Sequence, residues 1–190
     1  MKAGKKSNAE AQRGGEAERT DRWPLVRLGD VCEVINGMWK GVKPPFKNVG
    51  IIRSTNFTKQ CEFSIKNTVF IDVEEKKFYS RRLQVGDLVV ERSGGAPGLP
   101  VGRCVYIDAL DGEYSVSNFT SILRVNNQKF LDPKYLWRYL IALYYQGATE
   151  GIQSNTTGIH NLDFKAYLNF QVPLPPLATQ RAIVARLDSA

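Results

Sequence analysis

The chain has 190 residues, a formal net charge of +7, and 43% apolar and 24% charged residues, a balance that is typical of one globular domain. No apolar run approaches the roughly 18 residues of a membrane-spanning helix, and the N-terminus lacks the apolar core of a secretory signal. The three cysteines, Cys32, Cys61 and Cys104, are widely spaced and fit no zinc or disulfide pattern, which indicates reduced packing cysteines in a cytoplasmic protein.

The sequence divides into three segments. Residues 1–22 combine charged and small residues without apolar periodicity, so we expect a disordered leader. Residues 23–173 can form one folded domain, and residues 174–190 read as a proline corner followed by the start of a helix. The domain segment holds 18 basic and 14 acidic residues, a net charge of +4, which suits a nucleic-acid partner without identifying one.

Short strands dominate the first two thirds of the domain segment. Apolar alternation over Trp23–Ile35 predicts a strand or short helix before a turn at Asn36-Gly37. Met38–Gly50 contains two adjacent prolines and three lysines and is predicted to be a long loop. We predict strands at Gly50–Arg53, Asn67–Ile71, Leu88–Arg92, Gly102–Ile107, Tyr114–Val116 and Ser121–Val125, with a glycine loop over Gly94–Pro100.

One long helix has clear boundary signals. Asp132 is a helix N-cap, Pro133 occupies the first helical position, and Gly147 ends the helix. Its apolar face consists of Leu136, Leu140, Leu143 and Tyr144. We then expect a polar loop at Gln153–Gly158, a helical turn at Asn161–Lys165 and a last strand at Asn169–Val172. The predicted fold is α+β, with an irregular, partly antiparallel sheet and one main helix.

The chain ends in a proline corner and an amphipathic segment. Pro173, Pro175 and Pro176 favour an extended backbone, and the following residues are strong helix formers with Ile183, Val184 and Leu187 on one face. An isolated helix below roughly 12–15 residues is marginal in water. We therefore expect this helix to be frayed until it is extended or covered by a partner.

Four motifs in this order resemble one known family. They are Trp23-Pro24-Leu25-Val26-Arg27-Leu28-Gly29-Asp30, then Ile51-Ile52-Arg53-Ser54-Thr55-Asn56-Phe57, then Gly86-Asp87-Leu88-Val89-Val90-Glu91-Arg92-Ser93-Gly94, and finally the Val172–Asp188 segment VPLPPLATQRAIVARLD. Together they resemble a target recognition domain of the specificity subunits of type I restriction-modification enzymes, over about residues 23–188. The last motif resembles the family's passage from the recognition domain into a long spacer helix.

The resemblance implies sequence-specific recognition of double-stranded DNA without catalysis or a cofactor. In that family two recognition domains read the two halves of a split target, modification subunits methylate adenine, and motor-nuclease subunits cut unmethylated DNA. The implied partners are therefore DNA, methyltransferase subunits, the motor-nuclease subunit through the complex, and a second recognition domain. The residues implied at the partner interface are Pro175, Pro176, Gln180, Ile183, Val184 and Leu187.

A basic window is the first candidate DNA contact. No acidic residue lies between Glu33 and Glu62, and lysine or arginine side chains in such a stretch can neutralise phosphates. The candidates are Lys40, Lys43, Lys47, Arg53 and Lys59, together with Asn56 of the family-like Arg-x-x-Asn segment. The residues alone equally allow a solvated basic loop whose aromatic residues, Trp39, Phe46 and Phe57, lie in the core.

Two further segments are candidate DNA contacts. Arg92, Ser93 and Gly94 end a predicted strand, where arginine can pair with phosphate or guanine and glycine permits close approach of the backbone. The alternative is that Arg92 pairs with Asp87 or Glu91. Amide and hydroxyl groups at Asn155, Thr156 and Thr157 can read base edges or bind phosphates, although an ordinary surface loop explains them too.

Enzymatic activity is not expected from these residues. Lys43-Pro44-Pro45-Phe46 resembles the catalytic tetrapeptide of amino-methyltransferases, but lysine cannot accept the hydrogen bond required at the first position. Asp72 with Glu74-Glu75-Lys76 is more simply a charged turn than a nuclease motif. Two other functions stay open: the recognition part of a fused restriction-methylation enzyme, and a decoy that binds methyltransferase subunits without reading DNA.

Overall fold

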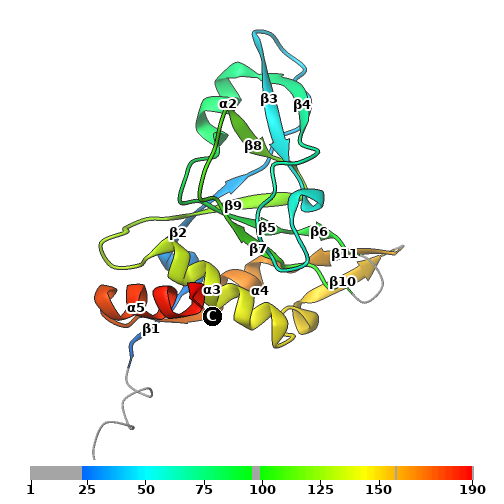
Figure 1. Ribbon diagram of the computed structural model, residues 1–190. Helices are drawn as coiled ribbons and strands as arrows, with labels where there is room; N and C mark the ends of the chain where they lie inside the picture. Colours follow the sequence, from blue (N-terminus) through cyan, green and yellow to red (C-terminus); the bar gives the residue numbers. More distant parts are fainter. Residues whose placement is uncertain (1–22, 96–98, 157, 190) are drawn as a thin grey trace, which may run out of the picture.

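The computed structural model describes residues 23–95, 99–156 and 158–189. The expected leader at residues 1–22 lies outside them. The chain folds into a lower body, which contains the helices α3, α4 and α5, and an upper lobe built from β3, β4, β8 and α2 (Figure 1). A central antiparallel sheet joins the two parts. The α+β fold, with several small sheets and one helix longer than the others, is as predicted.

The central sheet has the strand order β2-β9-β5-β7, with every neighbouring pair antiparallel. Its strands are β2 (Cys32–Asn36), β9 (Thr120–Val125), β5 (Leu88–Glu91) and β7 (Cys104–Tyr106). Every residue of β5 is buried. Because side chains alternate along a strand, Leu88 and Val90 join the core under α3, whereas Val89 joins the core that faces the upper lobe. The sheet is therefore covered on both faces.

The upper lobe has the strand order β4-β3-β8. Here β3 (Phe46–Ile52) is antiparallel to β4 (Val69–Glu74) and parallel to β8 (Tyr114–Val116). The predicted loop over Met38–Gly50 was wrong from Phe46 onward, because Val49 and Ile51 pack in a small core with Phe78. Phe78 belongs to α2 (Glu75–Arg81), a helix where the sequence predicted only a charged turn.

The lower body is organised by α3 (Pro133–Tyr145), whose boundary signals were predicted. The Asp132 carboxylate accepts hydrogen bonds from the Lys134 and Tyr135 amides at 2.9 and 3.2 Å, and Gly147 follows the helix with a φ of +79°. The antiparallel pair β1 (Leu25–Arg27) and β12 (Gln171–Pro173) brings the two ends of the domain segment side by side. Short helices α1 (Leu28–Val31) and α4 (Phe164–Leu168) contact each other near this pair.

A small side sheet replaces the predicted polar loop at Gln153–Gly158. Its strands β10 (Gln153–Thr156) and β11 (Ile159–Leu162) form a hairpin, and β6 (Ser93–Gly94) pairs with β11. This hairpin projects from the side of the lower body (Figure 1). Single turns of 3-10 helix lie at Ser54–Asn56 and Glu150–Ile152.

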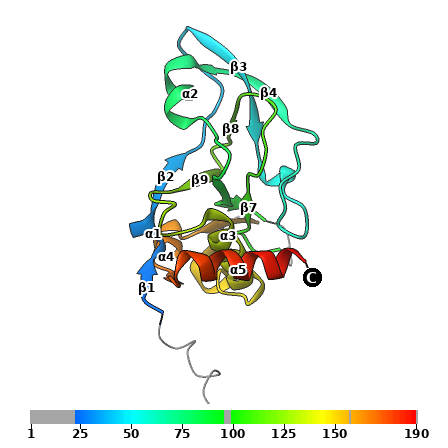
Figure 2. The same cartoon turned by 60° about the vertical axis from the view of Figure 1, so that its left-hand side comes forward.

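The helix α5 (Leu177–Asp188) lies along α3 (Figure 2). The C-terminal helix thus has a packing surface within the chain itself, which the sequence did not predict. Ile183 and Val184 are partly buried against the lower core, and Asp188 pairs with Lys134 and Arg138 of α3 at 2.5 and 2.6 Å. Two of the three residues in the predicted apolar stripe are thus used within the domain.

All three cysteines are free and buried, as predicted. Burial raises the pKa of the Cys32 thiol to about 12. The indole N–H of Trp137 donates to the carbonyl oxygens of both Cys61 and Cys104, at 3.3 and 3.2 Å. These residues therefore have a packing role. Among the described residues, no helix is both long and apolar enough to span a bilayer.

Candidate nucleic-acid interface

The connection between β2 and β3 carries exposed basic side chains. Lys40 and Lys43 are both exposed in it, and Lys59 is exposed in the connection between β3 and β4. Within residues 23–95, 99–156 and 158–189, none of the three forms an ion pair with a carboxylate. Their charges are therefore available to an anionic partner.

Lys47 differs from its predicted companions. Its ammonium pairs with Glu113 at 2.9 Å and lies 5.7 and 5.4 Å from the ring centres of Phe78 and Tyr79. The hydrogen bond to Glu113 raises the pKa of Lys47. Since its charge is already matched inside the upper lobe, Lys47 is a poor candidate for a phosphate contact.

The Arg53–Asn56 segment is built into the framework. Asn56 is 1% exposed. Its amide oxygen accepts a hydrogen bond from the Arg53 backbone N–H at 3.0 Å, and its amide nitrogen donates to the carbonyl oxygens of Ser64 and Lys66 at 3.1 and 3.0 Å. Asn56 is therefore a poor candidate for a DNA contact, because its amide is engaged within the domain and hidden from solvent. Arg53 stays partly exposed, with one weak bond of 3.4 Å from its guanidinium to the Asn67 carbonyl.

Arg92 is also held by its own domain. Its guanidinium donates to Asn36 and Ser121 at 3.1 and 3.3 Å and lies 4.5 Å from the centre of the Phe164 ring. Neither of the expected acidic partners is used, since Asp87 pairs with Arg124 and Glu91 pairs with Arg103. The partly buried Arg92 therefore joins the central sheet to α4, and its capacity for a further contact is small.

The remaining candidates lie on the side sheet. The Ser93 hydroxyl donates to the Asn161 side chain at 2.7 Å, and Gly94 has a φ of +131° where β6 meets His160 of β11. Asn155 is exposed in β10. Thr156 ends that strand, and Thr157 lies outside the described residues. The structure does not join this sheet and the lysine-bearing connection into one patch: the hairpin projects from the lower body, and the loop into β3 lies at the upper end (Figure 1).

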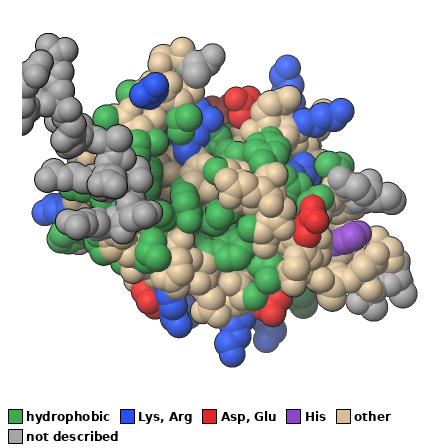
Figure 3. Space-filling model, turned by 90° about the horizontal axis from the view of Figure 1, so that it is seen from below, with side chains coloured by type: hydrophobic (Ala, Val, Ile, Leu, Met, Phe, Trp, Pro, Cys, Tyr) green, Lys and Arg blue, Asp and Glu red, His purple; other side chains and the backbone are tan. Residues whose placement is uncertain are grey.

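The residues expected at a partner interface separate into two groups. Gln180 is 0% exposed: its amide oxygen accepts the Asp132 N–H at 2.8 Å, and its amide nitrogen donates to the Phe130 and Pro175 carbonyls at 2.7 and 2.8 Å. Gln180 is therefore a poor candidate for a direct contact with a partner. Pro175 is buried, whereas Pro176 and Leu187 are exposed. Apolar side chains gather on the underside of the lower body (Figure 3).

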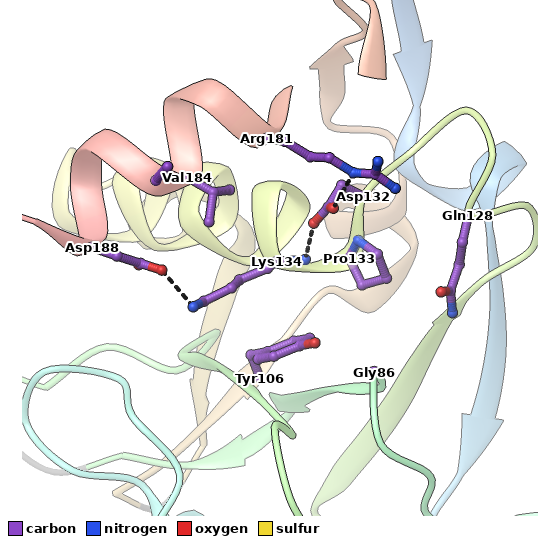
Figure 4. A pocket seen from close by; sticks show the side chains of 10 residues that line it. Gly86, Tyr106, Gln128, Asp132, Pro133, Lys134, Arg181, Val184 and Asp188 are labelled. Atoms are coloured by element: carbon purple, nitrogen blue, oxygen red, sulfur yellow. Dashed lines mark hydrogen bonds and ion pairs between the residues drawn. The ribbon is translucent and has the colours of Figure 1, made fainter. Parts of the chain in front are cut away.

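A shallow pocket of about 390 Å³ lies between the start of α3, the side of α5 that faces α3, and the central sheet (Figure 4). Its charged lining is already paired: Asp132 with Arg181 at 3.7 Å, and Asp188 with Lys134. The pocket therefore offers no unmatched charge for a substrate. The described residues also contain no group of histidine, cysteine or acidic side chains that could hold a metal ion.

Of the two enzyme-like motifs, the acidic one makes contacts within the upper lobe. Asp72 accepts a hydrogen bond from the Asn48 side chain at 2.8 Å. Glu74 pairs with Lys77 at 2.9 Å, and this contact lowers the pKa of Glu74. Lys43 is exposed on the way into β3. These acids stabilise the upper lobe, and sequence analysis missed this role because their partners belong to other elements.

The class of protein is shown by a family comparison: residues 20–190 match the family model described as the Type I restriction modification DNA specificity domain. The chain belongs to this family, as its motifs predicted. It is 26% identical over 139 residues to the type I restriction enzyme StySPI specificity subunit of Salmonella potsdam. The aligned region covers 73% of this chain and 28% of that protein.

Solved structures show the same fold. The HsdS subunit of Thermoanaerobacter tengcongensis matches 94% of this chain and 39% of its own, with a TM-score of 0.56 and 23% identity. A chain from a structural study of type I R-M complex assembly and conformational transition matches 94% of this chain and 40% of its own, with a TM-score of 0.61 and 21% identity. This chain thus spans less than half the length of these relatives.

Proposed function

We propose that this chain recognises a sequence in double-stranded DNA as a specificity component of a type I restriction-modification system, and that it catalyses neither methylation nor cleavage. The match of residues 20–190 to the specificity-domain family carries this proposal. The exposed lysines Lys40, Lys43 and Lys59 support it, because unpaired cations bind phosphates. We propose Arg53, Ser93, Gly94, Asn155, Thr156 and Thr157 as secondary contacts.

The proposed setting follows from the family. Methyltransferase subunits would dock on the lower body, the motor-nuclease subunit would join through them, and a second recognition domain would read the other half of the target, all in the cytoplasm. Residues 23–173 form the recognition domain in this proposal, after a leader at 1–22. Residues 174–190 form the proline corner and the start of a spacer helix.

The salt dependence of DNA binding tests the main proposal. We expect weak binding to duplex DNA, with log K falling against log salt by about 0.9 per neutralised phosphate. K40A and K43A should each lower this slope by about 1. K47A should leave the slope unchanged, because Lys47 is paired with Glu113. K129A is the matched control: it removes one exposed charge in the lower body and should also leave the slope unchanged. The measurement is a fluorescence-anisotropy titration at several salt concentrations.

Two results would contradict this proposal. Failure to bind duplex DNA at low salt and high protein concentration would favour the decoy that binds methyltransferase subunits without reading DNA. Equal slope changes in K40A and K129A would show that net charge, and not the connection between β2 and β3, determines binding.

Capture of the modification subunit tests whether α5 is part of the partner surface. Leu187 is 49% exposed at the end of α5, so a charge there disturbs no core contact but should prevent an apolar partner from burying the side chain. We expect L187D to weaken capture of the system's modification subunit at least tenfold and to leave DNA affinity unchanged. V85D, which changes a residue that is 58% exposed before β5, should capture normally. Normal assembly of L187D would move the partner surface away from α5.

A further inference from the structure

A tryptophan beside the available lysines is largely exposed. Trp39 is 67% exposed, next to Lys40 in the connection between β2 and β3. Val42 and Phe46, in the same stretch, are 81% and 48% exposed. Single exposed apolar residues are common, but large ones gathered in a small area usually mark a binding surface.

The backbone around Trp39 is firmly held. The Met38 amide donates to the Val116 carbonyl at 2.7 Å, and the Met38 side chain is buried. On the other side of Trp39, the Gly41 amide donates to the Asp72 carbonyl at 2.8 Å. The indole is therefore presented outward from a short segment that is anchored at both ends, which reduces the conformational entropy lost when a ligand binds it.

Charge in the upper lobe favours an anionic ligand for this indole. Glu74 and Glu113 pair with Lys77 and Lys47, whereas Asp72 accepts a hydrogen bond from the neutral Asn48 amide and keeps its charge. The neighbouring Lys40 and Lys43 have no such partner among the described residues. A flat aromatic ring near available cations fits a nucleic acid, whose phosphates bind the cations and whose bases stack on the ring.

We propose that Trp39 inserts its indole against the bases of the bound DNA, while Lys40 and Lys43 bind the flanking phosphates. This inference rests on the proposed function and adds a contact of a different physical kind. An apolar side chain that wedges at a base step unstacks it and kinks the duplex. Stacking releases no counterions, so the contribution of Trp39 is independent of salt, unlike that of the lysines.

The affinity of the full chain for duplex DNA, measured at several salt concentrations, tests this assignment. W39A should weaken binding by about 5- to 150-fold, the range for loss of one stacking aromatic residue, and should leave the salt slope unchanged. W39F should retain part of the affinity. F130A is the matched control, because Phe130 is 66% exposed in the connection between β9 and α3, and it should bind normally.

Fluorescence gives a second readout on the unmodified chain. Trp137 is 6% exposed and Trp23 is partly buried, so Trp39 is the indole most accessible to acrylamide. DNA should quench its emission and protect it from acrylamide, and W39F should lose both effects. If DNA binds but W39A keeps full affinity and DNA leaves the emission unchanged, the Trp39 assignment is wrong and the proposed function stands. If W39A and F130A lose affinity equally, the assignment also fails. No DNA binding by the unmodified chain would overturn the proposed function itself.

Discussion

We expect replacement of Arg103 by alanine to lower the free energy of unfolding by about 3–5 kcal/mol, the usual cost of leaving a buried charge without its partner. The Glu91 side chain is 1% exposed, and its two carboxylate oxygens accept bonds of 2.8 and 3.0 Å from the Arg103 guanidinium. The hydrogen bond that Arg103 donates to Glu91 raises the pKa of Arg103. Without this partner the carboxylate at the end of β5 keeps its burial but loses its counter-ion.

Chemical denaturation of three variants measures this effect. R27A removes an exposed pair, with side chains 54% and 59% exposed, and should cost less than about 1 kcal/mol. The double variant R103A/E91Q should recover part of the loss, because a neutral amide is cheaper to bury than a carboxylate. Equal stabilities for R103A and R27A would show that water reaches Glu91. The pair also means that Arg103, despite its charge, contributes to the central sheet and not to DNA binding.

Local signals in the sequence were sufficient for part of the fold. The N-cap Asp132, Pro133 and the terminating Gly147 lie within or beside α3, so its boundaries could be predicted without knowledge of the rest of the chain. The strand β8 (Tyr114–Val116) was predicted residue for residue. In each case the residues that determine the element are neighbours along the chain.

Elements that depend on distant partners were missed. The start of β3 is polar and follows two prolines, and it becomes a strand because Val49 packs against Phe78 of α2 and because β4 and β8 pair with it. The helix α2 likewise needs Phe78 in that core. Neither contact leaves a signal within the segment itself, so a loop and a charged turn were reasonable but wrong predictions.

The roles of the candidate site residues also depend on partners that are distant in the sequence. Asn56 and Arg92 have the residue types that contact DNA, but the same amide and guanidinium groups also satisfy buried backbone and side-chain oxygens. Their partners, Ser64 and Ser121 among them, lie 8 and 29 residues away. The family motif identified the fold correctly, but in these two positions it marks framework contacts. Lys47 differs from Lys40 and Lys43 only because it forms an ion pair with Glu113, which is distant in the sequence.

The second large effect is expected at Gln180, which fixes α5 to the domain. Its side chain satisfies the Asp132 amide and the Phe130 and Pro175 carbonyls, and each group left unsatisfied costs about 1–3 kcal/mol. We expect Q180A to lower the free energy of unfolding by about 3 kcal/mol. Hydrogen exchange should also quicken over α5 (Leu177–Asp188) before the rest of the lower body opens. R181A, which loses only the exposed 3.7 Å contact with Asp132, should change stability by less than about 1 kcal/mol.

A charged replacement at the same position sharpens the test. In Q180E the oxygen that accepts from Asp132 is kept, but a carboxylate oxygen then faces the Phe130 and Pro175 carbonyls, so at neutral pH the variant should be less stable than Q180A. This repulsion and burial raise the pKa of the new carboxyl group above the roughly 4.3 of an unfolded glutamate. The penalty relative to the unmodified chain is therefore full above the folded pKa and shrinks as pH falls through it, because the protonated acid can donate one hydrogen bond. A penalty independent of pH would mean that Gln180 is not enclosed. If the penalty behaves as expected, the proline corner and Gln180 together determine the direction in which α5 leaves the recognition domain, and with it the face that α5 presents to a modification subunit.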